Sequence, residues 1–269
     1  MNLGFGILDT FTSVRFRGNP TGVCVMTKTL TDEIMLSLAK EINFPVTAFI
    51  QKEKLSGNHF AIRYFTPTTE IPACGHATLA SAGFVFEREV LHQITFTTME
   101  DINLEVRKEG DLIVMTYPKY SLEYFNVSQV LLEGLGVNTY QSAGYCKELE
   151  TLFLEIEYPD ILRNIRPDFQ KLLRLHDPIK EIVVTSTSDL PEYDFLLRSF
   201  CPWIGIDEDP VTGSVHSVLG SFWQTRLQKD RLKAFQCSER GGELFITPLE
   251  NKVELGGKVV MVLRGEVCV

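Results

Sequence analysis

The sequence contains no long uncharged apolar run. Among its 269 residues, no window approaches the roughly 18 uncharged residues that a membrane-spanning helix needs. The N-terminal segment also lacks the basic cluster and apolar stretch of a secretory leader. We therefore expect a cytoplasmic protein without membrane partners.

Closely spaced cysteine pairs are also absent. The six cysteines are scattered, and none forms a Cys-x-x-Cys motif. Disulfide frameworks and thiolate zinc sites usually show such paired spacing. The sequence thus argues against both kinds of site, and free thiols fit a reducing compartment.

Basic clusters are lacking as well. The formal net charge of -9 would repel nucleic acid, and no run of Lys and Arg with interleaved aromatics offsets it locally. A Gly-x-Gly-x-x-Gly motif between a strand and a helix is missing, which argues against dinucleotide binding. A small anion can still bind at a helix start, where free N–H groups and the helix dipole act over a few ångströms.

Short runs of β-branched and aromatic residues predict strands throughout the chain. They lie at 4–9, 22–26, 47–51, 59–65, 93–97, 104–107 and 112–117, and then at 146–157, 181–185, 194–200, 244–247 and 259–265. Helical patterns cover 31–41, with Thr31 as the expected cap, and 75–88, 168–175 and 213–229. The helix at 75–88 is so apolar that we expect it to be buried.

An internal repeat is the most informative feature of the sequence. At one constant offset, Glu70, Pro72, Gly75 and Phe84 recur as Glu208, Pro210, Gly213 and Phe222. Just upstream, at an offset three residues shorter, Arg63-x-Phe65-x-Pro67 recurs as Arg198-x-Phe200-x-Pro202. A matched series in a matched structural context indicates gene duplication.

The repeat predicts an α+β fold with two lobes. The strand pattern fades over 118–130, so we place the boundary near residue 120, giving an N-terminal lobe of 1–120 and a C-terminal lobe of 121–269. In a pseudo-twofold arrangement, equivalent loops commonly face one another across a cleft, where ligands tend to bind. We therefore expect one small-molecule site shared by the two repeated loops.

The first repeated loop is Cys74-Gly75-His76, where a strand gives way to a helix. The first N–H groups of a helix have no intrahelical partner, so this start suits a substrate carboxylate. His76 would lie at its mouth as a proton donor or acceptor. The alternative is that Gly75 only makes a turn and His76 only caps the helix.

The second repeated loop is Thr212-Gly213-Ser214, which we expect to open a helix in the same way. Ser214 takes the repeat position of His76. Asp209 ends a run of three acidic residues, of which capping explains one, and we expect it to orient His76 or another imidazole.

Two further turns are candidate ligand contacts. Asn19, in Gly18-Asn19-Pro20, either closes its turn or binds the ligand through its amide. The Gly pair in Arg240-Gly241-Gly242 allows close backbone approach to a ligand, whereas Arg240 itself is equally well an ordinary surface charge.

Together these segments resemble the PhzF-like (phenazine biosynthesis-like) proteins of the diaminopimelate-epimerase fold. The resemblance rests on Asp9-x-Phe11, Gly18-Asn19-Pro20, Phe65-Thr66-Pro67, Glu70, the segment 74–80, the segment 208–214 and Arg240-Gly241-Gly242. It implies two lobes, each a curved, mostly antiparallel sheet around a central helix, with the last strand returning to the first lobe. It also implies a homodimer and isomerase chemistry without a cofactor or metal.

The resemblance also implies site residues. His76, Asp209 and Ser214 correspond to catalytic residues. The candidate substrate-binding set, combining the helix starts with the Asn19 turn, is Asn19, Cys74, Gly75, Thr212 and Gly213.

One position departs from the family pattern. PhzF-type isomerases move a proton between carbons of a small cyclic amino acid with the Glu of an Asn-x-x-Glu-Thr segment, where this chain has Val46 in Asn43-Phe44-Pro45-Val46-Thr47. The two-thiol mechanism of related epimerases is excluded too, because Thr212 takes the repeat position of Cys74. What remains is a His76–Asp209 acid/base pair, Cys74 as a one-sided base, or binding without turnover.

The leading hypothesis is therefore an isomerase-type protein for a small carboxylate-bearing metabolite, with altered or lost proton transfer. The alternative is a metabolite-binding or interaction protein that has lost its general base. A hydrolase with a Ser214 nucleophile is disfavoured, because no Gly-x-Ser-x-Gly turn is present.

Overall fold

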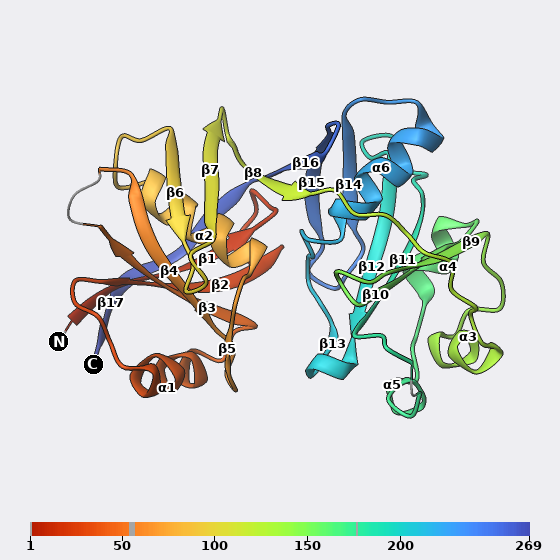
Figure 1. The fold of residues 1–269 in the computed structure, drawn as a ribbon, viewed down its shortest axis with the longest axis horizontal. Coiled ribbons are helices and arrows are strands. Elements are labelled where there is room, and N and C mark those ends of the chain that lie inside the picture. The colour runs from red at the N-terminus through yellow and green to blue at the C-terminus, as the bar shows by residue number, and fades with distance from the viewer. Residues whose placement is uncertain (1, 54–56, 176) are drawn as a thin grey trace. The chain divides into compact units, whose positions relative to one another are not determined.

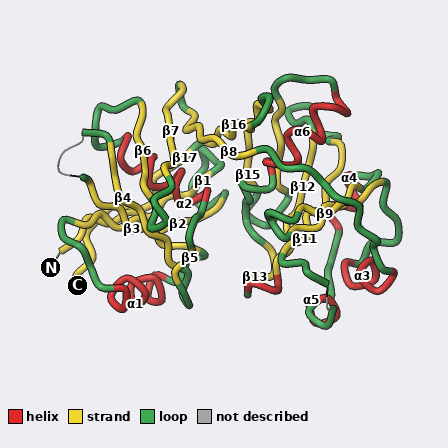
Figure 2. The backbone as a smooth tube through the Cα atoms, viewed as in Figure 1, coloured by secondary structure: helices red, strands yellow, loops and turns green. Residues whose placement is uncertain are grey.

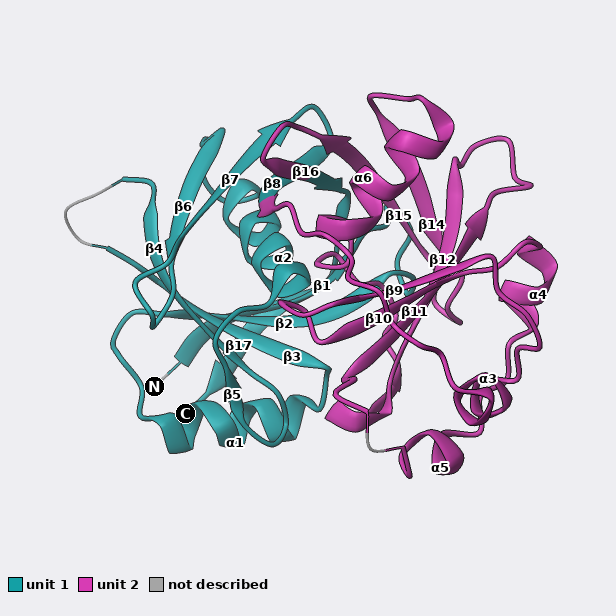
Figure 3. Cartoon of the chain, turned by 45° about the vertical axis from the view of Figure 1, so that its right-hand side comes forward, with its two compact units in different colours: residues 1–116, 255–269 teal, residues 117–254 magenta. Residues whose placement is uncertain are grey.

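The chain folds into two compact units (Figure 3). The computed structural model describes residues 2–53, 57–175 and 177–269. Unit 1 comprises Met1–Thr116 and Leu255–Val269, and unit 2 comprises Tyr117–Glu254. Strands outweigh helices in both units (Figure 2). Within the described ranges, no helix is long and apolar enough to cross a membrane.

Unit 1 is a mixed sheet in which most neighbouring strands are antiparallel. Strand β1 pairs with β17 and β2, β3 with β4, β6 with β7, and β7 with β8, all antiparallel, whereas β2–β3 and β4–β6 are parallel. The short β5 adds to β4. The bounds are β1 Asn2–Thr10, β2 Asn19–Met26, β3 Val46–Lys52, β4 His59–Phe65, β5 Glu70–Ile71, β6 Gln93–Thr97, β7 Asn103–Glu109, β8 Leu112–Pro118 and β17 Val259–Cys268.

The pairing of β1 with β17 brings the two ends of the chain together. Asn2 is the register partner of Cys268, so the termini lie side by side (Figure 1). The expected strand at 259–265 thus belongs to unit 1, to which the chain returns at Leu255.

Helix α2 (Gly75–Phe86) is the core of unit 1. Every residue from Ala77 to Phe86 is buried, as its apolar sequence predicted. The sheet approaches it closely: a Cβ on Gly6 would lie 2.6 Å from the Phe84 ring, and one on Gly83 would lie 2.7 Å from Val259. The other helix of unit 1, α1 (Asp32–Ile42), buries only Met35 and Ala39. Its expected cap, Thr31, makes no side-chain capping bond.

The strands of unit 2 also pair in both directions, within the same 17-stranded sheet of the described residues. Strands β9–β10, β11–β12 and β14–β15 are antiparallel pairs, β10–β11 and β12–β14 are parallel, and the short β13 adds to β12. Helix α6 (His216–Leu227) packs on β14 and β15. The other bounds are β9 Ser142–Cys146, β10 Thr151–Glu155, β11 Glu181–Thr187, β12 Phe195–Cys201, β13 Ile206–Glu208, β14 Leu232–Gln236, β15 Gly242–Pro248, β16 Lys252–Gly257, α3 Gln129–Leu135, α4 Pro159–Asn164, α5 Phe169–Leu172 and the 3₁₀ turn Pro202–Ile204.

The two units pair their strands in the same succession. From β1 to β7 the pairings run antiparallel, parallel, antiparallel, parallel, antiparallel, and those from β9 to β15 repeat this order. The registers agree as well. Thr47 pairs with Phe65 in unit 1, and Ile182 pairs with Phe200 in unit 2.

An arginine–glutamate fork joins two strands in each unit. In unit 1, Arg63 on β4 donates from Nε and Nη2 to Glu70 on β5, at 2.7 and 2.6 Å. In unit 2, Arg198 on β12 donates to Glu208 on β13 at 2.7 and 2.8 Å, and also to the carbonyl oxygen of Ile165. Both forks lie directly before a predicted functional loop.

Several elements differ from the sequence prediction. The predicted strand 146–157 covers β10 but starts at the last residue of β9 and runs through the turn between them, where Glu150 adopts a φ of 51° without Gly or Pro. The helix expected over 168–175 is only Phe169–Leu172. The pattern did not predict α3, α4, β14 or β16.

We expect Arg198→Met to destabilise the protein by about 3 kcal/mol or more, because it leaves the half-buried Glu208 carboxylate without its cation. Arg198 is only 7% exposed. Urea unfolding measures the loss. Arg107→Met is the matched control: its partner Glu109 is exposed, so the loss should stay below about 1 kcal/mol. Equal losses in the two variants would contradict the role given to the Arg198 fork.

Candidate functional site

The start of α2 brings a thiol and an imidazole together. Cys74 is the N-cap residue of the helix, and its Sγ lies 3.4 Å from Nδ1 and 3.6 Å from Nε2 of His76. Both residues are half-buried. The Cys74 carbonyl accepts the backbone N–H of Thr78 at 3.0 Å and the Thr78 hydroxyl at 2.8 Å, which fixes the first turn. This Cys–His contact suits proton transfer, because either group can hold the proton.

Cys74 differs from the buried cysteines of the chain. Burial raises the pKa of the Cys24 thiol to about 12, and it also raises the pKa of the Cys146 thiol. Burial also raises the pKa of Cys201. Such thiols stay protonated and are poor bases. The half-buried position of Cys74 beside an imidazole makes it the better candidate for chemistry.

Residues 209–212, called the Asp209 loop below, are held within unit 2 by hydrogen bonds to β14. Asp209 Oδ2 accepts the Thr212 hydroxyl at 2.5 Å. The side-chain amide of Gln236 closes the loop, since its Oε1 accepts the Thr212 N–H at 2.9 Å and its Nε2 donates to the Asp209 carbonyl at 2.8 Å. Gln236 is fully buried. This role of Gln236 could not be predicted from the sequence pattern, because its hydrogen bonds join residues far apart in the chain.

The turn between β14 and β15 adds a further tie to this loop. The Ser238 hydroxyl donates to the carbonyl of Pro210 at 2.5 Å and accepts the N–H of Gly241 at 3.1 Å. Arg240, a candidate from the sequence, lies half-buried in the same turn. The Gly241 φ of 64° explains the glycine there.

The second repeated loop does not open a helix at Gly213, and this part of the prediction is wrong. Helix α6 begins at His216, after turns in which the N–H groups of His216, Ser217 and Val218 bind the carbonyls three residues earlier. These tighter turns displace the helix start relative to the Gly75 position. Thr212 and Gly213 are buried, and Ser214 is half-buried with its carbonyl bound by Ser217 N–H.

Asn19 lies within the sheet of unit 1. It opens β2, is fully buried, and its carbonyl accepts the Thr10 hydroxyl at 3.1 Å. The neighbouring Asp9 accepts the Phe16 N–H at 2.7 Å. The structure thus gives the Asn19 backbone a turn-closing role and leaves its substrate role a prediction.

A carboxyl group that the sequence analysis missed lies beside the Asp209 loop. Glu181, the first residue of β11, accepts hydrogen bonds from the hydroxyls of Ser199 and Thr151. Ser199 in turn accepts the backbone N–H of Asp209 at 3.1 Å. Burial of the Glu181 carboxyl is the largest cause that raises its pKa to about 7, and the negative charge of Asp209 adds to the rise. A carboxyl with such a pKa can take and release a proton near neutral pH.

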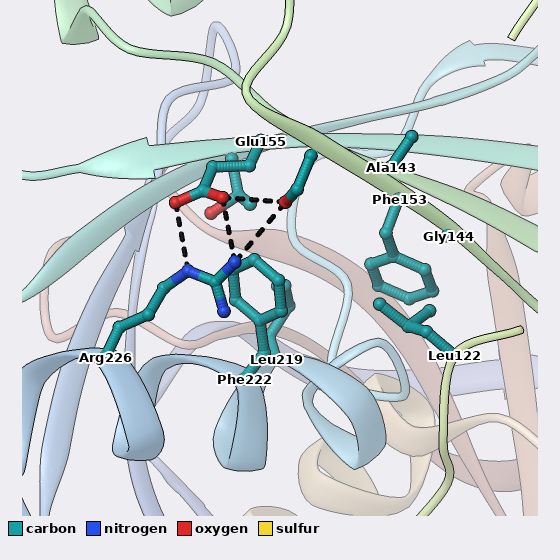
Figure 4. A pocket seen from close by; sticks show the side chains of 10 residues that line it. Leu122, Ala143, Gly144, Phe153, Glu155, Leu219, Phe222 and Arg226 are labelled. Carbon is teal, nitrogen blue, oxygen red and sulfur yellow. Dashed lines mark hydrogen bonds and ion pairs between the residues drawn. The ribbon is translucent and has the colours of Figure 1, made fainter. Parts of the chain in front are cut away.

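The structure also contains a cavity in unit 2 that none of the predicted residues lines (Figure 4). Its volume is about 140 Å³. On its wall, the buried Glu155 accepts two hydrogen bonds from Arg226, at 3.1 and 3.0 Å, and one from Ser142 at 2.7 Å. The remaining lining is mostly apolar. Because its charges are paired with each other, this cavity is not a candidate for the predicted chemistry.

Comparison with known proteins gives consistent matches over nearly the whole chain. The family model described as "Phenazine biosynthesis-like protein" matches residues 8–265. An uncharacterized isomerase of Halalkalibacterium halodurans is 38% identical, with 97% of this chain and 96% of that protein covered. A phenazine biosynthesis-like domain-containing protein of Bos taurus is 36% identical, with 98% and 99% covered. The crystal structure of a PhzF-family phenazine biosynthesis protein from Enterococcus faecalis superposes with a TM-score of 0.92 at 34% identity and covers all of both chains.

We expect Glu181→Gln to stabilise the protein at pH 8.5 by about 1–3 kcal/mol relative to wild type. The native state favours the protonated carboxyl, because its pKa is raised to about 7. The protonated carboxyl therefore stabilises the native state fully below the usual glutamate pKa, and this contribution to the free energy of unfolding is lost as the pH rises through 7. The variant removes that loss, so the two proteins should differ much less at pH 4.5. Urea unfolding at both pH values measures it, and an advantage independent of pH would contradict the assignment.

Proposed function

The chain belongs to the phenazine biosynthesis-like protein family, and from this membership we propose that it is a cofactor-independent isomerase-type protein that acts on a small carboxylate-bearing metabolite. We further propose a cytoplasmic homodimer. The observation that carries the proposal is the contact between Cys74 and His76 at the start of α2. A thiol and an imidazole at a helix start combine an anion-binding backbone with a proton donor and acceptor.

The proposed site residues are those that the family resemblance implies. His76, Asp209 and Ser214 are proposed to act on the substrate, and Asn19, Cys74, Gly75, Thr212 and Gly213 are proposed to bind it. Gene duplication is part of this proposal. The shared succession of strand pairings and the two arginine forks support it.

Names of relatives agree with an isomerase-type function. The Halalkalibacterium halodurans relative carries the name of an isomerase. That name supports isomerase chemistry for this chain as well. It says nothing about the substrate.

Val46 is the feature that favours the alternative function. It opens β3, is only 4% exposed, and has no group that can carry a proton. If this position was the sole site of the general base, the protein is a metabolite-binding or interaction protein that no longer turns over its ligand.

Solvent deuterium incorporation tests the proposed function directly. We expect wild type to incorporate deuterium into at least one member of a panel of cyclic and acyclic amino acids, as measured by mass spectrometry. His76→Ala should lower the rate by about 100-fold or more, because it removes an acid/base group. The exposed His92 provides the matched control, His92→Ala, which should leave the rate unchanged. Equal rates in both variants would exclude His76 from the reaction.

Val46→Glu separates the proposed function from the alternative. We expect wild type to catalyse exchange without a carboxylate at this position, so its activity should not depend on the substitution. The same deuterium assay measures both proteins. Exchange by Val46→Glu alone, with wild type inactive but still showing a ligand-dependent melting temperature, would make the native protein a binder that lost its base.

A further inference from the structure

Glu181 takes in unit 2 the position that Val46 takes in unit 1. Val46 is the first residue of β3 and pairs with Thr21 of the parallel strand β2. Glu181 is the first residue of β11 and pairs with Thr151 of the parallel strand β10. Strands β3 and β11 have the same neighbours in the succession of strand pairings.

The register on the other side of the two strands gives the same match. The residue after Val46 pairs with Phe65, and the residue after Glu181 pairs with Phe200. Phe65 and Phe200 are themselves equivalent in the repeated Arg-x-Phe-x-Pro segment. The two positions are thus equivalent residue for residue.

The surroundings of Glu181 differ from those of three other glutamates on strands. Glu70, Glu155 and Glu208 each bind an arginine. Among the described residues, no Lys or Arg side chain forms an ion pair with Glu181. Its partners are the neutral hydroxyls of Ser199 and Thr151, which bind a carboxyl in either protonation state.

The nearby titratable groups are acids. Asp209 and Cys201 both interact electrostatically with Glu181. Asp209 also belongs to the loop predicted to bind substrate, and its N–H is bound by the carbonyl of Ser199, the residue whose hydroxyl binds Glu181. The carboxyl is therefore connected through one residue to the predicted site. Glu181 as a whole residue is half-buried, whereas its carboxyl group is buried against the hydroxyls of Ser199 and Thr151.

We propose that Glu181 is the proton-transfer carboxyl of this protein, in place of a base that Val46 cannot supply. The proposal rests on the proposed function. The Glu181 carboxylate takes a proton from a substrate carbon: a C–H bond breaks, an O–H bond forms, and the electron pair spreads over the adjacent unsaturated group of the substrate. The same O–H then returns its proton to the same or another carbon. No oxidant or reductant is needed.

Glu181→Gln tests this assignment in the deuterium assay, with the amino acid that wild type exchanges fastest as the probe. We expect the exchange rate to fall by about 100-fold or more, while the probe still raises the melting temperature. The wild-type rate should increase with pH as a group titrating near pH 7 ionises, and the residual rate of the variant should lack that step. Glu155→Gln, a buried glutamate of the same unit that binds Arg226, is the matched control and should keep both the rate and its pH profile.

The outcomes separate the two proposals. Exchange by wild type that survives Glu181→Gln with its pH profile intact overturns the role of Glu181 and leaves the proposed function standing. Loss of exchange together with loss of the folded state is resolved by Glu181→Asp, which keeps the acid and should retain a measurable, pH-dependent rate. A folded Glu181→Asp with no pH-dependent exchange overturns the proposal.

If wild type exchanges no amino acid of the panel, the proposed function fails, and infrared difference spectra of wild type against Glu181→Gln judge Glu181 separately. The spectra are titrated with and without the panel member that raises the melting temperature most. A carboxyl band that disappears as the group ionises near pH 7, and that shifts when this amino acid is added, would support the placement of Glu181 at the ligand site. A band that does not respond to any amino acid overturns its placement there.

Discussion

Both candidate loops depend on the arginine–glutamate forks that precede them. A short two- or three-residue strand has too few backbone bonds to hold its position, and β5 and β13 are of this kind. Arg63 and Arg198 fix these strands through paired, charge-assisted bonds to Glu70 and Glu208. The segments that follow carry the Cys–His contact in unit 1 and the Asp209 loop in unit 2. The position of both loops therefore depends on an arginine side chain that is itself fixed on a strand.

The two units use these anchored loops differently. In unit 1 the chain enters the buried helix α2 directly, so a thiol and an imidazole meet within one turn. In unit 2 three tight turns come before α6, and Gln236 replaces backbone pairing by bonding both ends of the Asp209 loop. The same succession of strand pairings thus carries a thiol–imidazole pair in unit 1 and a network of carboxyls and hydroxyls in unit 2.

The sequence predicted most strands because their apolar runs are bounded by clear turns. His59–Phe65 and Gln93–Thr97 agree with β4 and β6 to the residue. The prediction was wrong where the residue types do not indicate the backbone conformation. Glu150 makes a left-handed turn that Gly or Asn usually makes, so the turn before β10 was predicted as strand and β9 was missed. The start of α6 was misplaced because turns with bonds between residues three apart look like helix in the pattern. Gln236 was missed because its bonds reach across the sheet.

Glu181 was missed for a different reason, since the sequence did contain its signal. The offset that relates Arg63 to Arg198 also relates Val46 to Glu181, but the residues around them are too dissimilar to show a repeat without the strand register. The energetic comparison then argues for function. A buried Val at such a position stabilises the sheet by hydrophobic burial, whereas a buried carboxyl without a cation costs stability. If the two units arose by duplication, as we propose, a costly carboxyl in one unit where the other has a stabilising Val supports a functional role for that carboxyl.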